Sequence, residues 1–528
     1  MELECLRVEP SKEVKVPERI CHMSLPSKLL DTSWDEDVRK VRSLRSCIGA
    51  SFATFTYASS KEHRLFILKQ KSLRVWQFQF YGRLDDTQRS LSYLKHLRYL
   101  NLSKSLFIVL PKSITRLLNL QTLKLDDCPY LKELPNGMKH MKNLMYLGLT
   151  NCGNLTRMSE GMGQLTCLQS LSCFIVGKDD GYQINELKEL NLRGKLCIKD
   201  LDNVTDLEEA KNVNLIGKQN LHSLSLVWQS NNMSHVSELA EDVLDGLRPH
   251  SNLKVLRIKR MPDLEVWRTV DGRESYSHLS TLRIICCPKL VELPIIPSIT
   301  SLHIERCNAM SFRSVMDLTL LSSLVIKGMD ELSVLPDGLL QNHKMLKFLH
   351  ISTLPNLKAL TNQLDNLSAL KDFHLEFCNK LESLPEGLQN LHSLQELYIE
   401  SCYNLLSFPM NGLRGLSSLR RLRIFSCYKI SSLSEGIKYL TALEDLQIRA
   451  CWELSSLPEG IQHLTSLRSL QITLIHHSVM SRAAMYLSSS IPSYFGQPAK
   501  RSYQEIQGIA NAQKSLGIGQ EEKARCVR

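Results

Sequence analysis

The sequence has 528 residues, of which 43% are hydrophobic, 23% charged and only 6% aromatic, a composition typical of a globular protein with an aliphatic core. No apolar run approaches the roughly 18 residues of a membrane-spanning helix, and the acidic start, from Met1 to Cys5, argues against a secretory signal. The net charge of +11 lies mainly in the flanks, because residues 97–475 hold 41 Lys and Arg against 39 Asp and Glu. The long middle therefore lacks the basic face of a nucleic-acid-binding domain, and no nucleic acid partner is expected.

Residues 1–72 are predicted to form an N-terminal cap or linker. Pro10, Pro17 and Pro26 interrupt the first 30 residues, and no repeating pattern precedes Leu73. Proline removes a backbone donor and breaks regular elements. We therefore expect an irregular cap with some strand.

A leucine-rich pattern then recurs over residues 73–475. Each unit approximates Leu-x-x-Leu-x-Ile/Leu-x-x-Cys, which is clearest from Leu394 to Cys402. Seventeen units occur, with first positions at Leu73, Leu97, Leu120, Leu144, Leu168, Leu192, Leu221, Leu253, Leu279, Ile299, Leu321, Leu346, Leu370, Leu394, Leu419, Leu443 and Leu467. This is the signature of the leucine-rich repeat.

The repeat predicts an α/β fold. Alternation at the fourth and sixth positions indicates a short strand with one buried face. Some 20 residues separate successive strands, so each strand pairs in parallel with the next coil and buries its leucines only against neighbouring coils. We expect a leucine-rich-repeat solenoid shaped as a horseshoe, with a curved parallel sheet on its concave face. Short helices, 3-10 turns and loops are expected on its convex side.

Two features are predicted for the convex side. The segment Leu-Pro-x-Gly, as at residues 384–387, favours a turn followed by a short helical or 3-10 segment before the next strand. Residues 236–247 carry apolar side chains at helical spacing and predict an amphipathic helix. Packing against the core is the favoured interpretation of that helix, and binding of a partner is the alternative.

Eight cysteines share the ninth position of their units. They are Cys128, Cys152, Cys287, Cys307, Cys378, Cys402, Cys427 and Cys451. The ligands of one metal site converge on a point, whereas these positions form a line along the solenoid. We expect buried, inert thiols rather than a metal or redox array.

No motif for catalysis or cofactor binding is present. The sequence contains no Gly-x4-Gly-Lys-Ser/Thr loop, no Gly-x-Ser-x-Gly elbow and no His-Glu-x-x-His pair. We therefore expect no enzyme activity, no catalytic residue, no cofactor and no metal ligand. An enzyme with its catalytic part in residues 476–528 is an alternative that we disfavour, because Cys526 has no room for a supporting fold. Residues 476–528 are predicted to form a poorly ordered tail.

The order of several motifs resembles a known family. They are His-Leu-Arg-Tyr-Leu-Asn-Leu-Ser at 96–103, Leu-Pro-Lys-Ser-Ile at 110–114, Gly-Met-Gly-Gln-Leu-Thr at 161–166, Phe-Ile-Val-Gly-Lys at 174–178, Leu-Arg-Gly-Lys-Leu at 192–196 and Glu-Ala-Lys at 209–211. Over roughly residues 10–475 the chain is similar to the repeat region of plant nucleotide-binding, leucine-rich-repeat disease-resistance proteins of the coiled-coil class. The coiled-coil and nucleotide-binding domains of that family have no matching positions here, so the resemblance does not imply nucleotide binding.

The candidate partner-binding residues lie at the second, third, fifth and seventh positions of three late units, which are predicted to face solvent. They are Glu396, Tyr398, Glu400, Arg420, Arg421, Arg423, Phe425, Glu444, Asp445 and Arg449. One interpretation is charge pairing that keeps a large surface soluble. The other is a charged recognition surface with Tyr398 and Phe425 as anchors.

A second aromatic row, Tyr403, Tyr428 and Trp452, follows the cysteines of three units. It is either a structural stack at one edge of the coils or an edge for partner docking.

The resemblance implies a non-enzymatic, intracellular protein-recognition module of plant defence, acting in the cytoplasm or the nucleus. Its partner would be a pathogen effector, a guarded host protein or a separate nucleotide-binding domain. The alternative function is a general leucine-rich-repeat scaffold for protein–protein interaction without an immune role.

Overall fold

The computed structural model describes residues 5–7, 20–25, 44–49, 70–77, 91–204, 206–229, 237–267, 276–360, 362–409 and 411–473. The expected tail at 476–528 lies outside these residues. Two compact units divide the chain: unit 1 is Met1–Met261 with Arg273–Leu279, and unit 2 is Pro262–Gly272 with Ser280–Arg528.

Unit 1 consists of short parallel strands with small helices between them. Its strands are β1 (Cys5–Arg7), β2 (His22–Leu25), β3 (Ser46–Gly49), β4 (Val75–Gln77), β5 (Tyr99–Asn101), β6 (Thr122–Lys124), β7 (Tyr146–Gly148), β8 (Ser170–Leu171), β9 (Cys173–Ile175), β10 (Gly194–Lys199), β11 (Leu221–Val227) and β12 (Val255–Lys259). Its helices are η2 (Lys112–Arg116), η3 (Met138–His140), η4 (Met162–Gln164), η5 (Ile184–Leu187), η6 (Leu201–Asn203), α4 (Leu207–Asn212), η7 (Leu215–Gly217) and α5 (Ser237–Gly246). Strands β1–β8 form one parallel sheet in chain order, and β9–β12 also pair in chain order.

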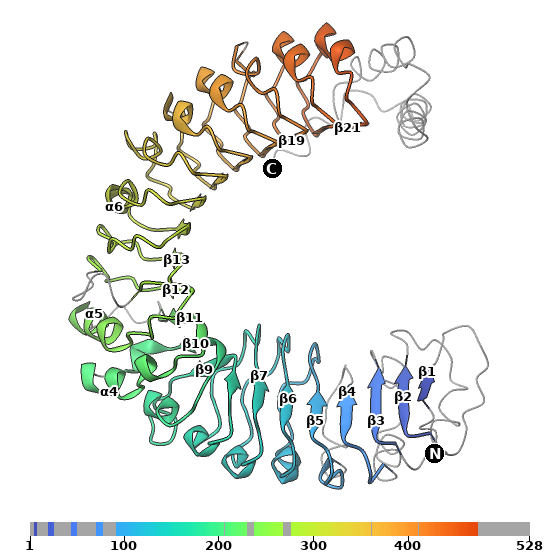
Figure 1. Cartoon of the computed structure of the whole chain (residues 1–528), viewed down its shortest axis with the longest axis vertical. Helices are drawn as coiled ribbons and strands as arrows, with labels where there is room; N and C mark the ends of the chain where they lie inside the picture. The colour runs from blue at the N-terminus through green and yellow to red at the C-terminus, as the bar shows by residue number, and fades with distance from the viewer. Residues whose placement is uncertain are drawn as a thin grey trace, which may run out of the picture. The chain divides into compact units, whose positions relative to one another are not determined.

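Unit 2 repeats the same plan with strands of uniform length. They are β13 (Thr281–Ile285), β14 (Ser301–Glu305), β15 (Ser323–Lys327), β16 (Phe348–Ser352), β17 (Asp372–Glu376), β18 (Glu396–Glu400), β19 (Arg421–Phe425), β20 (Asp445–Arg449) and β21 (Ser469–Thr473), paired in parallel in chain order. Its helices are η8 (Ala309–Ser311), α6 (Phe312–Val315), η9 (Asn362–Asn366), η10 (Glu386–Asn390), η11 (Glu435–Tyr439) and η12 (Glu459–His463). In each unit the strands line one side and the helices lie on the other (Figure 1).

The predicted α/β leucine-rich-repeat fold is confirmed. Each of the seventeen predicted units contributes a parallel strand, and in most of them the first, fourth and sixth positions are buried, as at Leu394, Leu397 and Ile399. The unit that starts at Leu192 differs, because the register shifts between Gly194 and Lys195: Leu196 and Ile198 are buried there, and Lys195 at the fourth position is exposed. The helix predicted near 236–247 is α5, whose residues Val243 and Leu244 are buried. The short segment after a Leu-Pro-x-Gly sequence is a 3-10 helix, as in η10.

Three short strands lie in the described parts of residues 1–72, where a cap with some strand was expected. Strands β1, β2 and β3 pair in parallel and in sequence with β4. Ile20, Met23, Leu44 and Cys47 are buried at spacings that match the first and fourth positions of later units. The repeat geometry therefore begins before Leu73, with residues other than leucine at several inner positions.

A left-handed residue ends each strand of the later coils. Phe377, Ser401, Ser426 and Ala450, all at the eighth position, have φ of 53–54°. This conformation costs a non-glycine residue roughly 1–2 kcal/mol. The N–H of Ser401 donates to the Phe425 carbonyl at 2.9 Å, and that of Ser426 to the Arg449 carbonyl at 2.8 Å. These hydrogen bonds between coils offset the cost of the left-handed conformation. The left-handed residue turns the chain toward the cysteine at position nine.

Candidate functional site

Strands β18, β19 and β20 place the candidate residues in three straight rows. In each strand the second and fourth residues are buried, whereas the first, third and fifth lie on the open face of the sheet. The parallel register aligns Glu396, Arg421 and Asp445 in one row. The next row is Tyr398, Arg423 and Gln447, and the last is Glu400, Phe425 and Arg449. The inward and outward assignment of these strands is therefore as the periodicity predicts.

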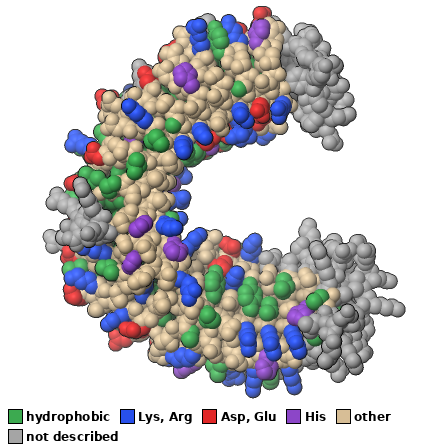
Figure 2. All heavy atoms as spheres, viewed as in Figure 1, with side chains coloured by type: hydrophobic (Ala, Val, Ile, Leu, Met, Phe, Trp, Pro, Cys, Tyr) green, Lys and Arg blue, Asp and Glu red, His purple; other side chains and the backbone are tan. Residues whose placement is uncertain are grey.

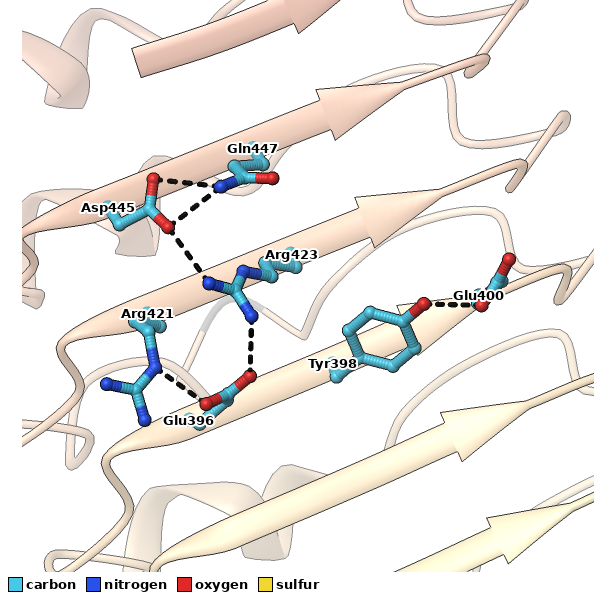
Figure 3. Close-up of polar contacts among 7 residues, drawn as sticks. All are labelled: Glu396, Tyr398, Glu400, Arg421, Arg423, Asp445 and Gln447. Atoms are coloured by element: carbon cyan, nitrogen blue, oxygen red, sulfur yellow. Dashed lines mark hydrogen bonds and ion pairs between the residues drawn. The ribbon is translucent and has the colours of Figure 1, made fainter. Parts of the chain in front are cut away.

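The central feature is a charged cluster, defined as Glu396, Arg421, Arg423 and Asp445. Glu396 accepts from Arg421 Nε at 2.6 Å and from Arg423 Nη1 at 3.0 Å. The second arm of Arg423, Nη2, reaches Asp445 at 3.4 Å. Gln447 completes the group by donating to Asp445 at 2.9 Å. One guanidinium thus bridges the carboxylates of both neighbouring strands (Figure 3).

The members of the charged cluster differ in exposure. The side chain of Glu396 is 12% exposed, that of Arg423 31% and that of Arg421 42%. Arg421 binds Glu396 only through Nε, and within the described part of the chain no hydrogen bond engages its terminal nitrogens. Glu396 and Arg423 are therefore engaged within the charged cluster, whereas the terminal nitrogens of Arg421 remain as donors that this cluster does not use.

Further charges surround the cluster. Arg420, just before β19, and Arg468, just before β21, approach Glu444 from both sides at 3.8 and 3.9 Å. Arg420 and Arg468 are exposed, so these long contacts contribute little to stability. On the strand side of unit 2, Lys and Arg side chains alternate with Asp and Glu side chains near the last strands (Figure 2).

An aromatic row crosses four consecutive strands beside the charged cluster. It comprises Phe348 and His350 of β16, His374 of β17, Tyr398 of β18 and Phe425 of β19. Successive ring centroids lie 5.2 Å apart for Phe348 and His374, 5.4 Å for His374 and Tyr398, and 5.6 Å for Tyr398 and Phe425. At the end of the row, the guanidinium of Arg449 lies 5.3 Å from the centroid of the Phe425 ring.

Three members of the aromatic row, Phe348, His350 and His374, were not among the candidate residues predicted from the sequence. The signal was present, because the unit that starts at Leu346 puts Phe348 at its third position and His350 at its fifth. The candidate set contained only residues of the units from Leu394 onward. The aromatic row therefore extends to β16, beyond the strands that hold the predicted candidate residues.

Burial and nearby charged groups together set the protonation of the polar side chains along the aromatic row. His350 Nε2 lies 3.3 Å from a carboxylate oxygen of Glu376, and this close contact is the main cause that holds the pKa of Glu376 below its ordinary value. Burial lowers the pKa of His374, assisted by the nearby His350. The Tyr398 hydroxyl donates to Glu400, and burial together with this carboxylate raises the pKa of Tyr398. At neutral pH the row therefore presents neutral His374 and Tyr398 beside charged Glu376.

The second predicted aromatic row lies at the ends of the strands. Tyr403 and Tyr428 stack with centroids 4.8 Å apart and an interplanar angle of 9°, as a structural stack would. Trp452 is half exposed, at 51%, and within the described residues no ring contact joins it to Tyr428. The stack is thus formed by two of the three predicted residues.

The ninth-position cysteines are buried thiols, as predicted. The Cys402 thiol donates to the Glu400 carbonyl at 3.6 Å and the Cys427 thiol to the Phe425 carbonyl at 3.4 Å. Burial raises the pKa of the Cys451 thiol to about 11, which disfavours the reactive thiolate. Among the residues described, no group of three metal-ligating side chains gathers into a site.

The repeats are similar to those of known proteins. Residues 184–307 match the family model described as R13L1/DRL21 LRRs. The sequence is 31% identical over 277 residues to the putative disease resistance protein RGA1 of Solanum bulbocastanum (38% of this chain, 28% of that protein). It is 47% identical over 203 residues to the disease resistance protein RGA2 of the same species (34% and 20%). It is 32% identical over 319 residues to the putative disease resistance RPP13-like protein 1 of Arabidopsis thaliana (57% and 30%).

The chain spans at most 30% of the length of these relatives. The resemblance to the repeat region of plant disease-resistance proteins is thereby confirmed. Among solved structures, the LRR protein LIC12759 of Leptospira interrogans is similar with a TM-score of 0.46 at 20% identity, covering 88% of this chain and 98% of that protein. Within the described ranges no helix combines the length and hydropathy that crossing a membrane requires.

Proposed function

We propose that this chain is a non-enzymatic protein-recognition module of plant defence, which binds a pathogen effector or a host protein through the open face of β16–β20. The similarity to disease-resistance proteins supports the role in defence. Proteins of this kind act in the cytoplasm or the nucleus, and we propose the same compartments here. A separate nucleotide-binding domain is a further candidate partner.

The main observation that supports the proposal is the aromatic row, which lies beside half-exposed arginines. Five rings run without a break from Phe348 to Phe425, and Arg421 offers guanidinium donors next to them. Tyrosine and arginine are enriched among residues that dominate binding energy. Rings held by neighbouring rings lose little conformational freedom on binding, which favours affinity. A surface that only maintained solubility would need charges but not this row.

The test compares partner capture by matched variants of the whole chain in challenged plant tissue. Arg421→Glu and Tyr398→Ala change the proposed surface, whereas Lys211→Glu changes an exposed side chain of α4 as a control. We expect a partner that is retained by wild type and Lys211→Glu and lost by both surface variants. With that purified partner, Arg421→Glu should weaken binding by about 2 kcal/mol, or about 30-fold in Kd.

The general scaffold is the competing function. It predicts the same captured proteins in unchallenged and challenged tissue. Retention of every partner by Arg421→Glu and Tyr398→Ala, with both variants folded, would overturn the proposed recognition surface.

A further inference from the structure

Two cysteines outside the ninth positions face each other in unit 1. Cys173 of β9 and Cys197 of β10 are partners in the parallel register. In-register residues of adjacent parallel strands lie about 4.8 Å apart and project from the same face. That separation falls within the roughly 4.4–6.8 Å between Cα atoms that a disulfide spans. Each of the two thiols is also the main influence on the pKa of the other, as expected for neighbouring in-register side chains.

The pair differs from the ninth-position cysteines in its access to solvent. Cys197 lies on the open face of β10, between the buried residues Leu196 and Ile198, and is half-buried. Cys173 is only 4% exposed. Cys402 and Cys427, in contrast, are both fully buried at the turns behind their strands. A small solute can therefore reach Cys197 first, with Cys173 beside it on the neighbouring strand.

Polar and charged neighbours stabilise the thiolate of Cys197. The hydrogen bond from Cys173 is the main cause that lowers the pKa of Cys197 to about 7, against the opposing effect of burial. Ser225, its partner on β11, and the positive charges of Lys199 and Lys259 also lower this pKa. Its hydrogen bond to Cys197, burial and the nearby thiolate raise the pKa of Cys173, which stays protonated. An accessible low-pKa cysteine beside a second cysteine is the arrangement of peroxide-sensitive thiols.

We propose that Cys173 and Cys197 form a dithiol site that reacts with hydrogen peroxide and closes to a reversible disulfide. The Cys197 thiolate attacks one peroxide oxygen, the O–O bond breaks, and the products are Cys197 sulfenic acid and hydroxide. The Cys173 sulfur then attacks the sulfenic sulfur, the S–O bond breaks, and the Cys173 proton leaves with the hydroxyl as water. Two thiols are oxidised and one peroxide is reduced. This site does not depend on the proposed recognition function.

The experiment treats the reduced, purified full chain with hydrogen peroxide, blocks remaining thiols with N-ethylmaleimide and maps tryptic peptides by mass spectrometry. Cleavage after Arg157, Lys178, Lys195 and Lys199 places Cys197 in one short peptide and Cys173 in another that also contains Cys167. The Cys167→Ser variant removes that ambiguity and serves as the matched control, because Cys167 is exposed. We expect wild type and Cys167→Ser to give the same linked peptides, which dithiothreitol separates.

Single variants distinguish the two roles. Cys197→Ser should abolish both the link and the peroxide reaction. Cys173→Ser should abolish the link but leave a sulfenic acid at Cys197 that dimedone captures. At pH 7 the alkylation of Cys197 in the folded protein should be at least about tenfold faster than that of buried Cys402. Absence of the 173–197 link in folded wild type, or reaction of Cys197 with peroxide no faster than that of Cys167, would overturn the proposal.

Discussion

At the scale of single residues, two arginines of β19 have the same charge and different surroundings. Arg421 shares one bond with Glu396 and is 42% exposed, whereas Arg423 bridges Glu396 and Asp445, whose side chains are 12% and 18% exposed. Removing Arg423 leaves two half-buried carboxylates without their common donor. An exposed ion pair is worth less than about 1 kcal/mol, whereas an unpaired buried polar group costs roughly 1–3 kcal/mol.

We therefore expect Arg421→Ala to lower the free energy of unfolding by less than about 1 kcal/mol. Arg423→Ala should lower it by roughly 1–3 kcal/mol. Urea denaturation of both variants measures the difference. Equal losses would mean that Arg423 does not hold the two strands together through its guanidinium, and the charged cluster would then be a surface feature only.

His374 predicts a pH dependence of stability. Its pKa in the folded protein lies below the ordinary value of 6.5, first because of burial and then because of His350, while Glu396, Glu376 and Asp372 act in the opposite direction. The unfolded chain thus binds a proton at a higher pH than the folded chain does. Stability is complete above pH 6.5 and falls as the pH drops from 6.5 toward the folded pKa, by less than about 1.4 kcal/mol per pH unit.

The measurement is the free energy of unfolding of wild type and His374→Gln between pH 7.5 and pH 5.5. Below pH 6.5 the free energy of unfolding of the variant should depend less steeply on pH than that of wild type. Some pH dependence should remain, because burial also lowers the pKa values of His303 and His343. His392→Gln is the control, because His392 is exposed on the far side of the coil. An unchanged slope in His374→Gln would contradict the role assigned to burial.

At the scale of elements, neighbouring coils approach so closely at some positions that only glycine fits there. A Cβ on Gly415 would lie 1.5 Å from the carbonyl oxygen of Gln389 in η10 of the preceding coil. Backbone cannot move aside as a flexible side chain does, so Gly415→Ala should cost more than about 2 kcal/mol. Gly153→Ala is the control, since nothing lies within 4 Å of its added Cβ. Thermal melting of the two variants compares them, and equal melting temperatures would refute the close packing at Gly415.

Periodicity predicted strands and buried faces well because they depend only on which positions are apolar. It failed where the inner positions are not leucine, as at Met23 and Cys47 of β2 and β3. It also could not separate β9 from β8, because both come from the unit that starts at Leu168. The two short strands join different sheets, and that break depends on packing between coils rather than on spacing along the chain.

The partners of side chains on the open face were harder to predict. The register correctly indicated that Arg421 lies beside Glu396, yet the bridge made by Arg423 depends on the rotamer of one long side chain. The aromatic row depends on ring contacts between strands that start about 24 residues apart in sequence, as for His374 and Tyr398. Sequence spacing determines which strands are neighbours and which residues share a face, but not which ring touches which.

At the scale of the whole molecule, a repeat protein lacks contacts between distant coils. Each coil of unit 2 pairs only with the coil before and the coil after it, as β19 does with β18 and β20. Stability is then a sum of coil and interface contributions, and damage in one coil spreads mainly to its neighbours. The charges on the open face follow the same rule, because the charged cluster joins only three successive strands.

The substitution Leu422→Ala tests whether damage to one coil of unit 2 spreads only to its neighbours. Leu422 is 1% exposed and lies in register between Leu397 and Leu446, so its truncation opens a cavity between coils and should cost roughly 2–5 kcal/mol. Hydrogen exchange should show a large loss of amide protection in β18, β19 and β20 and little change in β13 and β14. Arg421→Ala, one residue away on the open face, should change neither region. If the loss were equal from β13 to β21, unit 2 would unfold as one cooperative block, and the coil-by-coil account of its stability would be wrong.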